Sequence, residues 1–310
     1  MSHLIISKKN EVFLQVKAEP HVYYELADQF TFEVPGAKFM PQYRNKYWDG
    51  KIRLFNSRNQ TLPYGLLEHV LRFAEERNYE VDMASDVATD KVVTDCDQFI
   101  KELPLTVGGD EIEPRDYQID AVKHALSNQR AVLISPTGSG KSLIIYILIR
   151  WFLENSEQKC LIIVPTTSLV EQMYKDFEDY GWIPDQHVQR KYYGYEIDES
   201  KPVVISTWQS LATFDKKYFE QFGAVFGDEA HLFKSKSLIS IMTKLHHAKY
   251  RFGFTGTLDG TQTHKWILEG VFGPSYNVTK TSELMEKGHL SKLDIQCLVL
   301  KHNPQKFNTF

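Results

Sequence analysis

The sequence predicts an α/β fold, a mostly parallel sheet with helices on both faces, preceded by a small α+β N-terminal domain. Between residues 113 and 257, apolar runs of strand length alternate with helical patterns, which is the order of a parallel sheet with crossover helices. The strands there are apolar throughout, as in CLIIV at 160–164, which indicates burial on both faces. Ligands of such sheets bind where the strands end, so we expect a site at the carboxyl edge.

The composition is that of an ordinary globular protein with room for two domains. The chain has 310 residues, of which 42% are hydrophobic and 25% charged, and its formal net charge is −4. Because that net charge repels nucleic acid, any nucleic-acid surface must be local. Cys96, Cys160 and Cys297 are too few and too scattered for a disulfide framework or a zinc site. No apolar run reaches membrane-spanning length, and we expect a cytoplasmic protein.

Residues 1–84 predict the small α+β domain. Pro20 and Pro63 each suit the first position of a helix, where the missing amide hydrogen costs nothing. The expected elements are strands at 11–17, 30–34 and 78–82, helices at 20–29 and 63–77, and a hairpin at 42–56. Residues 85–112 read as a linker that contains one short helix near 95–103.

Residues 113–280 predict the α/β domain. Pro114 and Asp116 favour a helix start, since proline suits the first position and a carboxylate suits the first turn. Ser168 and Glu171 have the spacing of a capping box, so we expect one helix to start at Ser168. The other expected elements are strand 130–135, helix 140–153, strand 160–164, helix 168–179, and strands 202–206, 223–227 and 249–254.

A phosphate-binding loop is predicted between the first of these strands and its helix. Its glycines let successive backbone N–H groups turn toward an anion, and the helix N-terminus adds partial positive charge. Lys141 would meet the β- and γ-phosphates, and Ser142 would bind Mg²⁺. The nucleotide-binding candidates are Ser135, Pro136, Thr137, Gly138, Ser139, Gly140, Lys141 and Ser142. Ser135 departs from the general pattern, which has glycine there. The loop predicts a bound nucleoside triphosphate.

Two carboxylates follow another apolar strand, at Asp228 and Glu229. In phosphate-loop ATPases, a strand-terminal acid holds Mg²⁺, and a neighbouring glutamate polarises the attacking water. We assign these two roles to Asp228 and Glu229, with Lys141 as the third catalytic candidate. The alternative is structural, because an acidic pair after a strand also suits a helix N-cap and its first turn.

With these residues in order, the chain resembles the superfamily 2 helicases and translocases, in the branch whose second motif is Asp-Glu-Ala-His. The resemblance covers residues 113–260. It also includes segments like the family's adenine-reading motif (115–118), motif Ia (161–172), motif Ib (205–209) and motif III (254–257). By this resemblance, Arg115 and Gln118 contact the nucleotide, and Thr166, Thr167, Thr207 and Gln209 contact a nucleic-acid strand. His231, Thr255, Gly256 and Thr257 couple the two sites.

The resemblance implies a RecA-like first motor domain that uses ATP and Mg²⁺. The implied partner is duplex, branched or single-stranded DNA, with RNA–DNA hybrids also possible substrates, and the implied roles are recombination, repair and replication-fork processing by a monomer. Residues 281–310 resemble the start of a second motor domain. No segment resembles the arginine-bearing motifs of that domain, so we expect residues 1–310 to bind ATP with little turnover. An RNA helicase and a non-motor protein such as a small-molecule kinase stay open as alternatives.

The expected hairpin supplies a nucleic-acid surface outside the family motifs. Asp49 and Gly50 favour a two-residue turn, which would place Trp48 opposite Lys51 and Lys46 opposite Arg53. One face would then be basic and aromatic, as suits phosphates and exposed bases. Its candidates are Arg44, Lys46, Trp48, Lys51 and Arg53, with Phe55 beside them. The alternative is an edge hairpin that lysines keep soluble.

Overall fold

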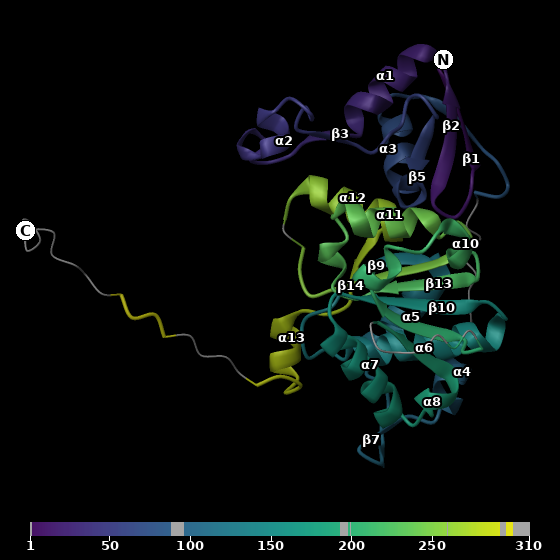
Figure 1. The fold of residues 1–310 in the computed structure, drawn as a ribbon, viewed down its shortest axis with the longest axis vertical. Coiled ribbons are helices and arrows are strands. Elements are labelled where there is room, and N and C mark those ends of the chain that lie inside the picture. Colours follow the sequence, from purple (N-terminus) through teal and green to yellow (C-terminus); the bar gives the residue numbers. More distant parts are fainter. Residues whose placement is uncertain are drawn as a thin grey trace, which may run out of the picture.

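The computed structural model describes residues 2–87, 96–192, 198, 200–258, 260–291 and 296–299. It contains a small N-terminal unit (residues 2–87) and a larger unit built on one wide sheet (residues 96–291), which lie against each other (Figure 1). Parts of two expected segments lie outside the described residues, namely 88–95 of the linker and 292–295 and 300–310 of the last segment.

The larger unit contains a parallel sheet of seven strands in the order β11-β12-β10-β13-β14-β9-β15. The strands are β9 (Arg130–Ile134), β10 (Lys159–Val164), β11 (Val188–Lys191), β12 (Val203–Thr207), β13 (Phe222–Gly227), β14 (Tyr250–Thr255) and β15 (Ser275–Asn277). This confirms the predicted fold class. Sequence analysis missed β11 and β15, the two edge strands, because edge strands are short and more polar and do not show the continuous apolar pattern.

Helices cover both faces of this sheet (Figure 1). One face carries α4 (Asp97–Glu102), α5 (Asp116–Asn128), α6 (Lys141–Asn155), α7 (Thr167–Asp179) and α8 (Pro184–His187). The other carries α9 (Trp208–Leu211), α10 (Lys216–Phe219), α11 (Lys236–Lys244) and α12 (Gln262–Phe272). Neighbouring residues of a strand pack into the cores on opposite faces of the sheet. Leu133 and Ile162 belong to the core under α4–α8, and Val132 and Leu161 to the core under α9–α12. Burial on both faces explains the continuous apolar strands.

The N-terminal unit is a four-stranded mixed sheet in the order β5-β2-β1-β6, covered by two helices. Its elements are β1 (His3–Lys8), β2 (Phe13–Ala18), α1 (Pro20–Gln29), β5 (Thr61–Pro63), α3 (Leu67–Glu76) and β6 (Glu80–Met83). Alternate residues point into the core, as Leu4 and Ile6 do from β1. Sequence analysis found α1, α3, β2 and β6 to within a few residues but missed β1 and β5. In the larger unit, β7 (Thr106–Val107) and β8 (Asp110–Glu111) form a small ribbon at the end farthest from the N-terminal unit (Figure 1). Helix α13 (Thr281–Glu286) follows the large sheet.

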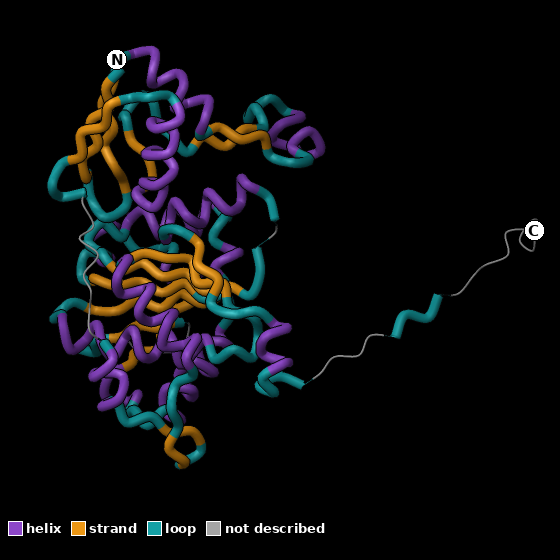
Figure 2. Tube along the Cα trace, turned by 180° about the vertical axis from the view of Figure 1, so that it is seen from behind, coloured by secondary structure: helices purple, strands orange, loops and turns teal. Residues whose placement is uncertain are grey.

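The expected hairpin at 42–56 was wrong. Residues before the turn form a short helix, α2 (Pro41–Arg44), and β4 (Lys51–Arg53) pairs instead with β3 (Thr31–Glu33). Figures 1 and 2 show that β3, α2 and β4 form an arm (residues 31–53) that projects from the N-terminal unit. Pro41 starts a helical turn at its favoured position, so this segment is not available as a strand. Phe55, expected beside the basic face, is buried in the core.

Helix α12 joins the two units. The side chain of Trp266 is 8% exposed and enters the core of the N-terminal unit, where its ring centroid lies 5.3 Å from Phe30 and 5.1 Å from Phe32. His69 Nε2 and Glu269 Oε2, one from each unit, are 2.8 Å apart. The Gly65 backbone packs so closely that a Cβ atom there would lie 1.8 Å from the Glu269 carbonyl oxygen. The interface therefore combines a buried ring, a buried polar pair and direct backbone packing.

No helix among the described residues is long and apolar enough to cross a membrane.

Candidate nucleotide and nucleic-acid sites

The predicted phosphate loop lies between β9 and the N-terminus of α6. Gly138 and Gly140 have φ angles of +80° and +77°, a left-handed conformation that glycine adopts without strain. Ser135 is fully buried, and its Oγ lies 2.6 Å from Ser139 Oγ, which donates to the Pro136 carbonyl oxygen. A hydroxyl at position 135 thus replaces the usual glycine by closing the loop with side-chain hydrogen bonds. The loop has the conformation that an anion site requires.

Arg115, Tyr117 and Gln118 brace the loop from α5 and the residue before it. Gln118 Nε2 and the Tyr117 hydroxyl donate to the Ser139 carbonyl oxygen at 2.9 and 3.0 Å. Gln118 also accepts from the Arg115 backbone N–H at 2.9 Å, and Arg115 donates to the Tyr117 hydroxyl at 2.9 Å. Gln118 is only 4% exposed. Its described contacts fix the loop, and its contact with an adenine stays a prediction.

Asp228 and Glu229 stand at the carboxyl end of β13, in the cavity that contains the phosphate loop. This cavity has a volume of about 390 Å³ and is lined by Gly138, Lys141 and Ser142 together with both acids. Burial raises the pKa of the Asp228 carboxyl above its ordinary value. Asp228 Oδ1 is buried without a hydrogen-bond partner among the described residues.

An unsatisfied buried carboxylate oxygen is costly, and a bound cation would satisfy it. Oxygen donors are the ligands that Mg²⁺ prefers, and Ser142 supplies a second one in the same cavity. Lys141 Nζ is 3.9 Å from Glu229 Oε1, so the cation and both acids share one space. The side chains present therefore fit Mg²⁺ and a triphosphate.

Two residues that sequence analysis missed approach Ser142 from α7. The Ser142 hydroxyl lies 2.8 Å from the Tyr180 hydroxyl, and Asp176 hydrogen-bonds the same serine. Asp176 also lines the nucleotide cavity. No local pattern marks these residues, because they meet Ser142 only through the packing of α7 on α6.

The candidate coupling residues form a connected network. His231 Nδ1 lies 3.2 Å from Thr255 Oγ1 and 3.2 Å from Glu229 Oε2. The Thr255 hydroxyl donates to the Thr257 carbonyl oxygen at 2.9 Å, across Gly256. These contacts connect the end of β13 to the end of β14, its neighbour in the sheet. The contacts connect Glu229, His231 and Thr255, and the coupling role stays a prediction.

The motif candidates for strand contact follow β10 and β12, which are adjacent. Thr166 caps α7 by accepting from the Leu169 backbone N–H, so this helix begins at Thr167 and the expected start at Ser168 was wrong. Thr166, Thr167 and Gln209 are exposed, whereas the side chain of Thr207 is only 5% exposed. Thr207 could contact a strand only through its backbone.

The basic candidates of the arm divide into two groups. Arg44 and Lys46 surround a hollow of about 600 Å³ beside Trp48 at the tip, and Lys51 and Arg53 stand on β4. Lys46 and Arg53 are not paired as the expected register required. Arg53 forms an ion pair with Asp49, and hydrogen bonding to Arg53 lowers the pKa of Asp49 to about 2. An anion would have to share Arg53 with this carboxylate.

Comparison with known proteins agrees with the geometry. Residues 111–260 match the family model of the type III restriction enzyme res subunit, and residues 6–84 match that of the N-terminal region of DNA helicase UvsW. The chain is 36% identical over 302 residues to the ATP-dependent DNA helicase uvsW of Enterobacteria phage T4, over 96% of this chain and 60% of that protein. It thus spans about 60% of that relative's length. A more distant relative is the DNA 3′-5′ translocase XPB2 of Sulfurisphaera tokodaii, 30% identical over 64% of this chain and 43% of that protein.

A crystal structure of the UvsW helicase from bacteriophage T4 superposes with a TM-score of 0.82 and 34% identity, covering 89% of this chain and 99% of that one. A second T4 UvsW structure gives a TM-score of 0.84 at 34% identity, covering 91% of this chain and 58% of that one. The two family-model matches include β2 to β6 of the N-terminal unit and β9 to β14 of the large sheet. The chain therefore belongs to the UvsW-like family of superfamily 2 helicases.

Proposed function

We propose that this chain is the ATP-binding part of a DNA helicase or translocase that acts on branched DNA in recombination, repair and replication-fork processing. The observation that carries the proposal is the meeting of three groups at one sheet edge: the phosphate loop, the acids Asp228 and Glu229, and the network through His231 to Thr255. The T4 relative, an ATP-dependent DNA helicase by name, supports the choice of reaction and substrate.

We also propose a function for each segment of the chain. Residues 1–84 bind nucleic acid, 85–112 link the units, 113–280 form the first motor domain, and 281–310 begin the second. In such motors, ATP lies between two RecA-like domains, and an arginine from the second one accelerates phosphoryl transfer by roughly 10³ to 10⁵. Residues 113–280 would supply the phosphate loop and the acid pair of such a site.

Each polar side chain of the cavity has a specific task in this proposal. Lys141 leaves Glu229 to bind the β- and γ-phosphates, and the loop N–H groups bind the phosphate oxygens. Ser142 and Asp228 would hold Mg²⁺, which would supply positive charge to offset the charge on the phosphates. Glu229, once separated from Lys141, orients the attacking water and accepts its proton.

The network through His231 would transmit changes at Glu229 to the motif III segment, residues 254–257. Glu229 lies within hydrogen-bond distance of His231, and His231 contacts Thr255, so a change at Glu229 alters the end of β14. His231 suits this role because its ring can donate or accept. Its backbone carbonyl also lies 3.0 Å from His264 Nε2 on α12, which connects the network to the helix that holds the N-terminal unit.

The test is nucleotide binding and turnover with duplex DNA, branched DNA, single strands and RNA in turn. In a protein that carries both motor domains, we expect DNA, and branched DNA most strongly, to stimulate turnover, and Glu229→Gln to retain ATP binding while losing that turnover. Stimulation by RNA alone would favour the RNA helicase alternative. Tight binding of a second small substrate, without stimulation by any nucleic acid, would favour the kinase alternative and refute the proposal.

A further inference from the structure

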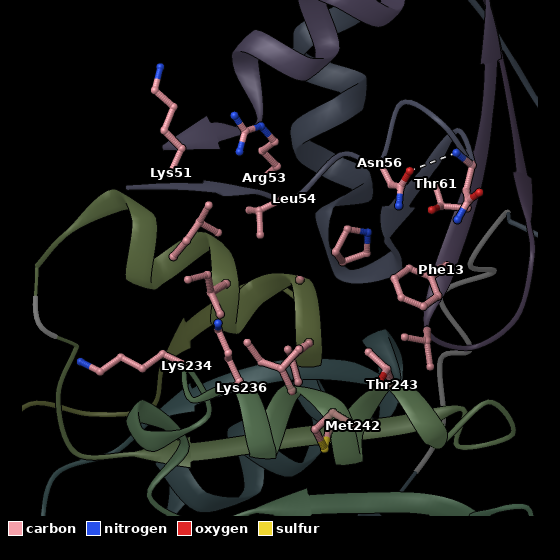
Figure 3. Close-up of a pocket in the computed structure, with 18 of the residues that line it drawn as sticks. Phe13, Lys51, Arg53, Leu54, Asn56, Thr61, Lys234, Lys236, Met242 and Thr243 are labelled. Atoms are coloured by element: carbon pink, nitrogen blue, oxygen red, sulfur yellow. Dashed lines mark hydrogen bonds between the residues drawn. The ribbon is translucent and has the colours of Figure 1, made fainter. Parts of the chain in front are cut away.

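A groove runs between the arm and the helices α11 and α12. Its volume is about 680 Å³. Ile52 and Leu54 line one wall, and Ile239, Met242 and Ile267 line the other. Figure 3 shows Leu54 on the side of the arm that faces Met242, whereas Lys51 and Arg53 extend from the opposite side of β4. Two apolar surfaces, one from each unit, therefore face each other without filling the space between them.

The charged residues of this groove are all cationic among those that the structure describes. Its charged lining residues are Lys9, Lys51, Arg53, Lys234, Lys236 and Arg251, and no described carboxylate contributes. Arg251 is buried and donates to backbone carbonyl oxygens. Because the charged ends of Lys51 and Arg53 point away from the groove in Figure 3, an anion in it would be bound mainly by Lys9, Lys234 and Lys236. A lining without described carboxylates is unusual in a chain with 40 acidic and 36 basic residues. Asp49 and Glu33 lie outside the lining, where they offset Arg53 and Lys51. Lys236 rises toward the groove in Figure 3 and Lys234 lies near its mouth, and both are exposed. The lysines at the groove therefore favour an anionic ligand over a cationic one.

The remaining lining residues can recognise the faces and edges of planar groups. Phe13 and Trp48 are aromatic, and the Trp48 indole N–H donates to the Lys51 carbonyl oxygen at 2.8 Å, which fixes its ring. Hydrogen-bonding side chains also line it, at Gln42, Asn56, Asn59, Thr61 and Thr243. Apolar walls, hydrogen-bonding groups and cations together match the faces, edges and phosphates of unpaired nucleotides.

We propose that this groove holds a single strand of nucleic acid, with its bases against the apolar walls and its phosphates at Lys234 and Lys236. A duplex fits less well, because it stacks its bases inside and presents mainly its backbone, which would leave the apolar walls unused. The inference rests on the proposed helicase function and deepens it, since it gives a place to one of the two strands after they separate.

The position of the groove connects it to the nucleotide site. Lys234 and Lys236 follow the segment of Asp228 and His231 by a few residues, at the start of α11. The other helix of this wall, α12, receives the contact from His264 to the His231 carbonyl oxygen. A strand in the groove would thus contact α11, which follows the acid pair in the chain, and α12, which contacts His231.

The test compares variants of residues 1–310 for binding of a fluorescent oligothymidine across a salt series. Lys234→Ala with Lys236→Ala should lower affinity on the order of tenfold to a hundredfold at about 50 mM salt, and reduce the slope of log affinity against log salt by about 1.4, because each phosphate contact on a single strand contributes about 0.7. Thr243→Phe, which fills the groove without changing charge, should also weaken binding. An oligothymidine that carries 4-thiothymidine should crosslink to groove residues.

The matched control removes two exposed lysines elsewhere, Lys101→Ala with Lys175→Ala. An equal loss in this control, or an unchanged slope in the groove variant, would overturn the groove proposal while leaving the helicase proposal intact. Stronger competition by an acidic amphipathic peptide than by the oligonucleotide would overturn it in favour of a protein partner. Failure of the wild type to bind any DNA, together with intact ATP binding, would count against the proposed function itself.

Discussion

Replacement of Trp266 by alanine should weaken the interface between the two units and lower the free energy of unfolding. The indole is 8% exposed and is the one side chain of the large-sheet unit in the described core of the N-terminal unit. Deleting a buried tryptophan costs about 3–5 kcal/mol in free energy of unfolding, because the transfer energy is lost and a cavity remains. This cost includes the free energy of the ring contacts with Phe30, Phe32 and His69.

The assay is thermal and chemical unfolding of residues 1–310, followed by circular dichroism. A chain of 310 residues has an unfolding entropy that converts 1 kcal/mol into roughly 1.5 °C of Tm, so we expect a decrease of about 5–8 °C. Because Trp266 is the buried anchor of the interface, we also expect the single transition to broaden or split as the units lose cooperativity.

Trp266→Phe provides the control, since it retains most of the buried area and should recover more than half of the loss. A decrease below about 1 kcal/mol for the alanine variant would show that the ring contributes little, because such a value lies well under the range for a buried aromatic. That result would refute the view that α12 fixes the N-terminal unit to the large sheet.

The other predictions concern single charged groups. Lys141→Ala should abolish ATP binding in a fluorescent-nucleotide titration, whereas Glu229→Gln should bind ATP normally, because Lys141 is the one basic side chain among the described residues that line the cavity. Burial opposes ionisation of Glu269, but its hydrogen bonds outweigh burial and lower its pKa below the ordinary 4.5. Its ionised form therefore stabilises the fold above about pH 4.5, and this contribution should be lost as pH falls through the lowered pKa. Asp49→Asn should free Arg53 and steepen the salt dependence of duplex binding by up to about 0.9.

Each of these has a clear contrary outcome. Equal loss of ATP binding in the two cavity variants would remove the proposed role of Glu229. The Glu269→Gln variant should lose the acid-dependent part of its unfolding free energy, and an unchanged pH profile would locate that dependence elsewhere. For Asp49→Asn, an unchanged salt slope would show that Arg53 makes no phosphate contact.

The sequence by itself determined the features that depend on local composition. The phosphate loop could be recognised because Gly138 and Gly140 must adopt left-handed angles beside an anion, and the structure gives them those angles. The central strands could be recognised because burial on both faces requires continuous apolar residues. Parallel strands that end at one edge then placed Asp228 and Glu229 beside the loop, as the cavity confirms.

The tertiary structure alone decided which segments become partners. The turn at Asp49 and Gly50 favours a hairpin locally, yet β4 pairs with β3, because strand pairing is settled by the packing of distant segments. Tyr180 and Asp176 reach Ser142 through the packing of α7 on α6, which has no sequence signature. The groove forms where the arm lies close to α11 and α12. Its two walls come from separate units, so neither segment alone indicates a site.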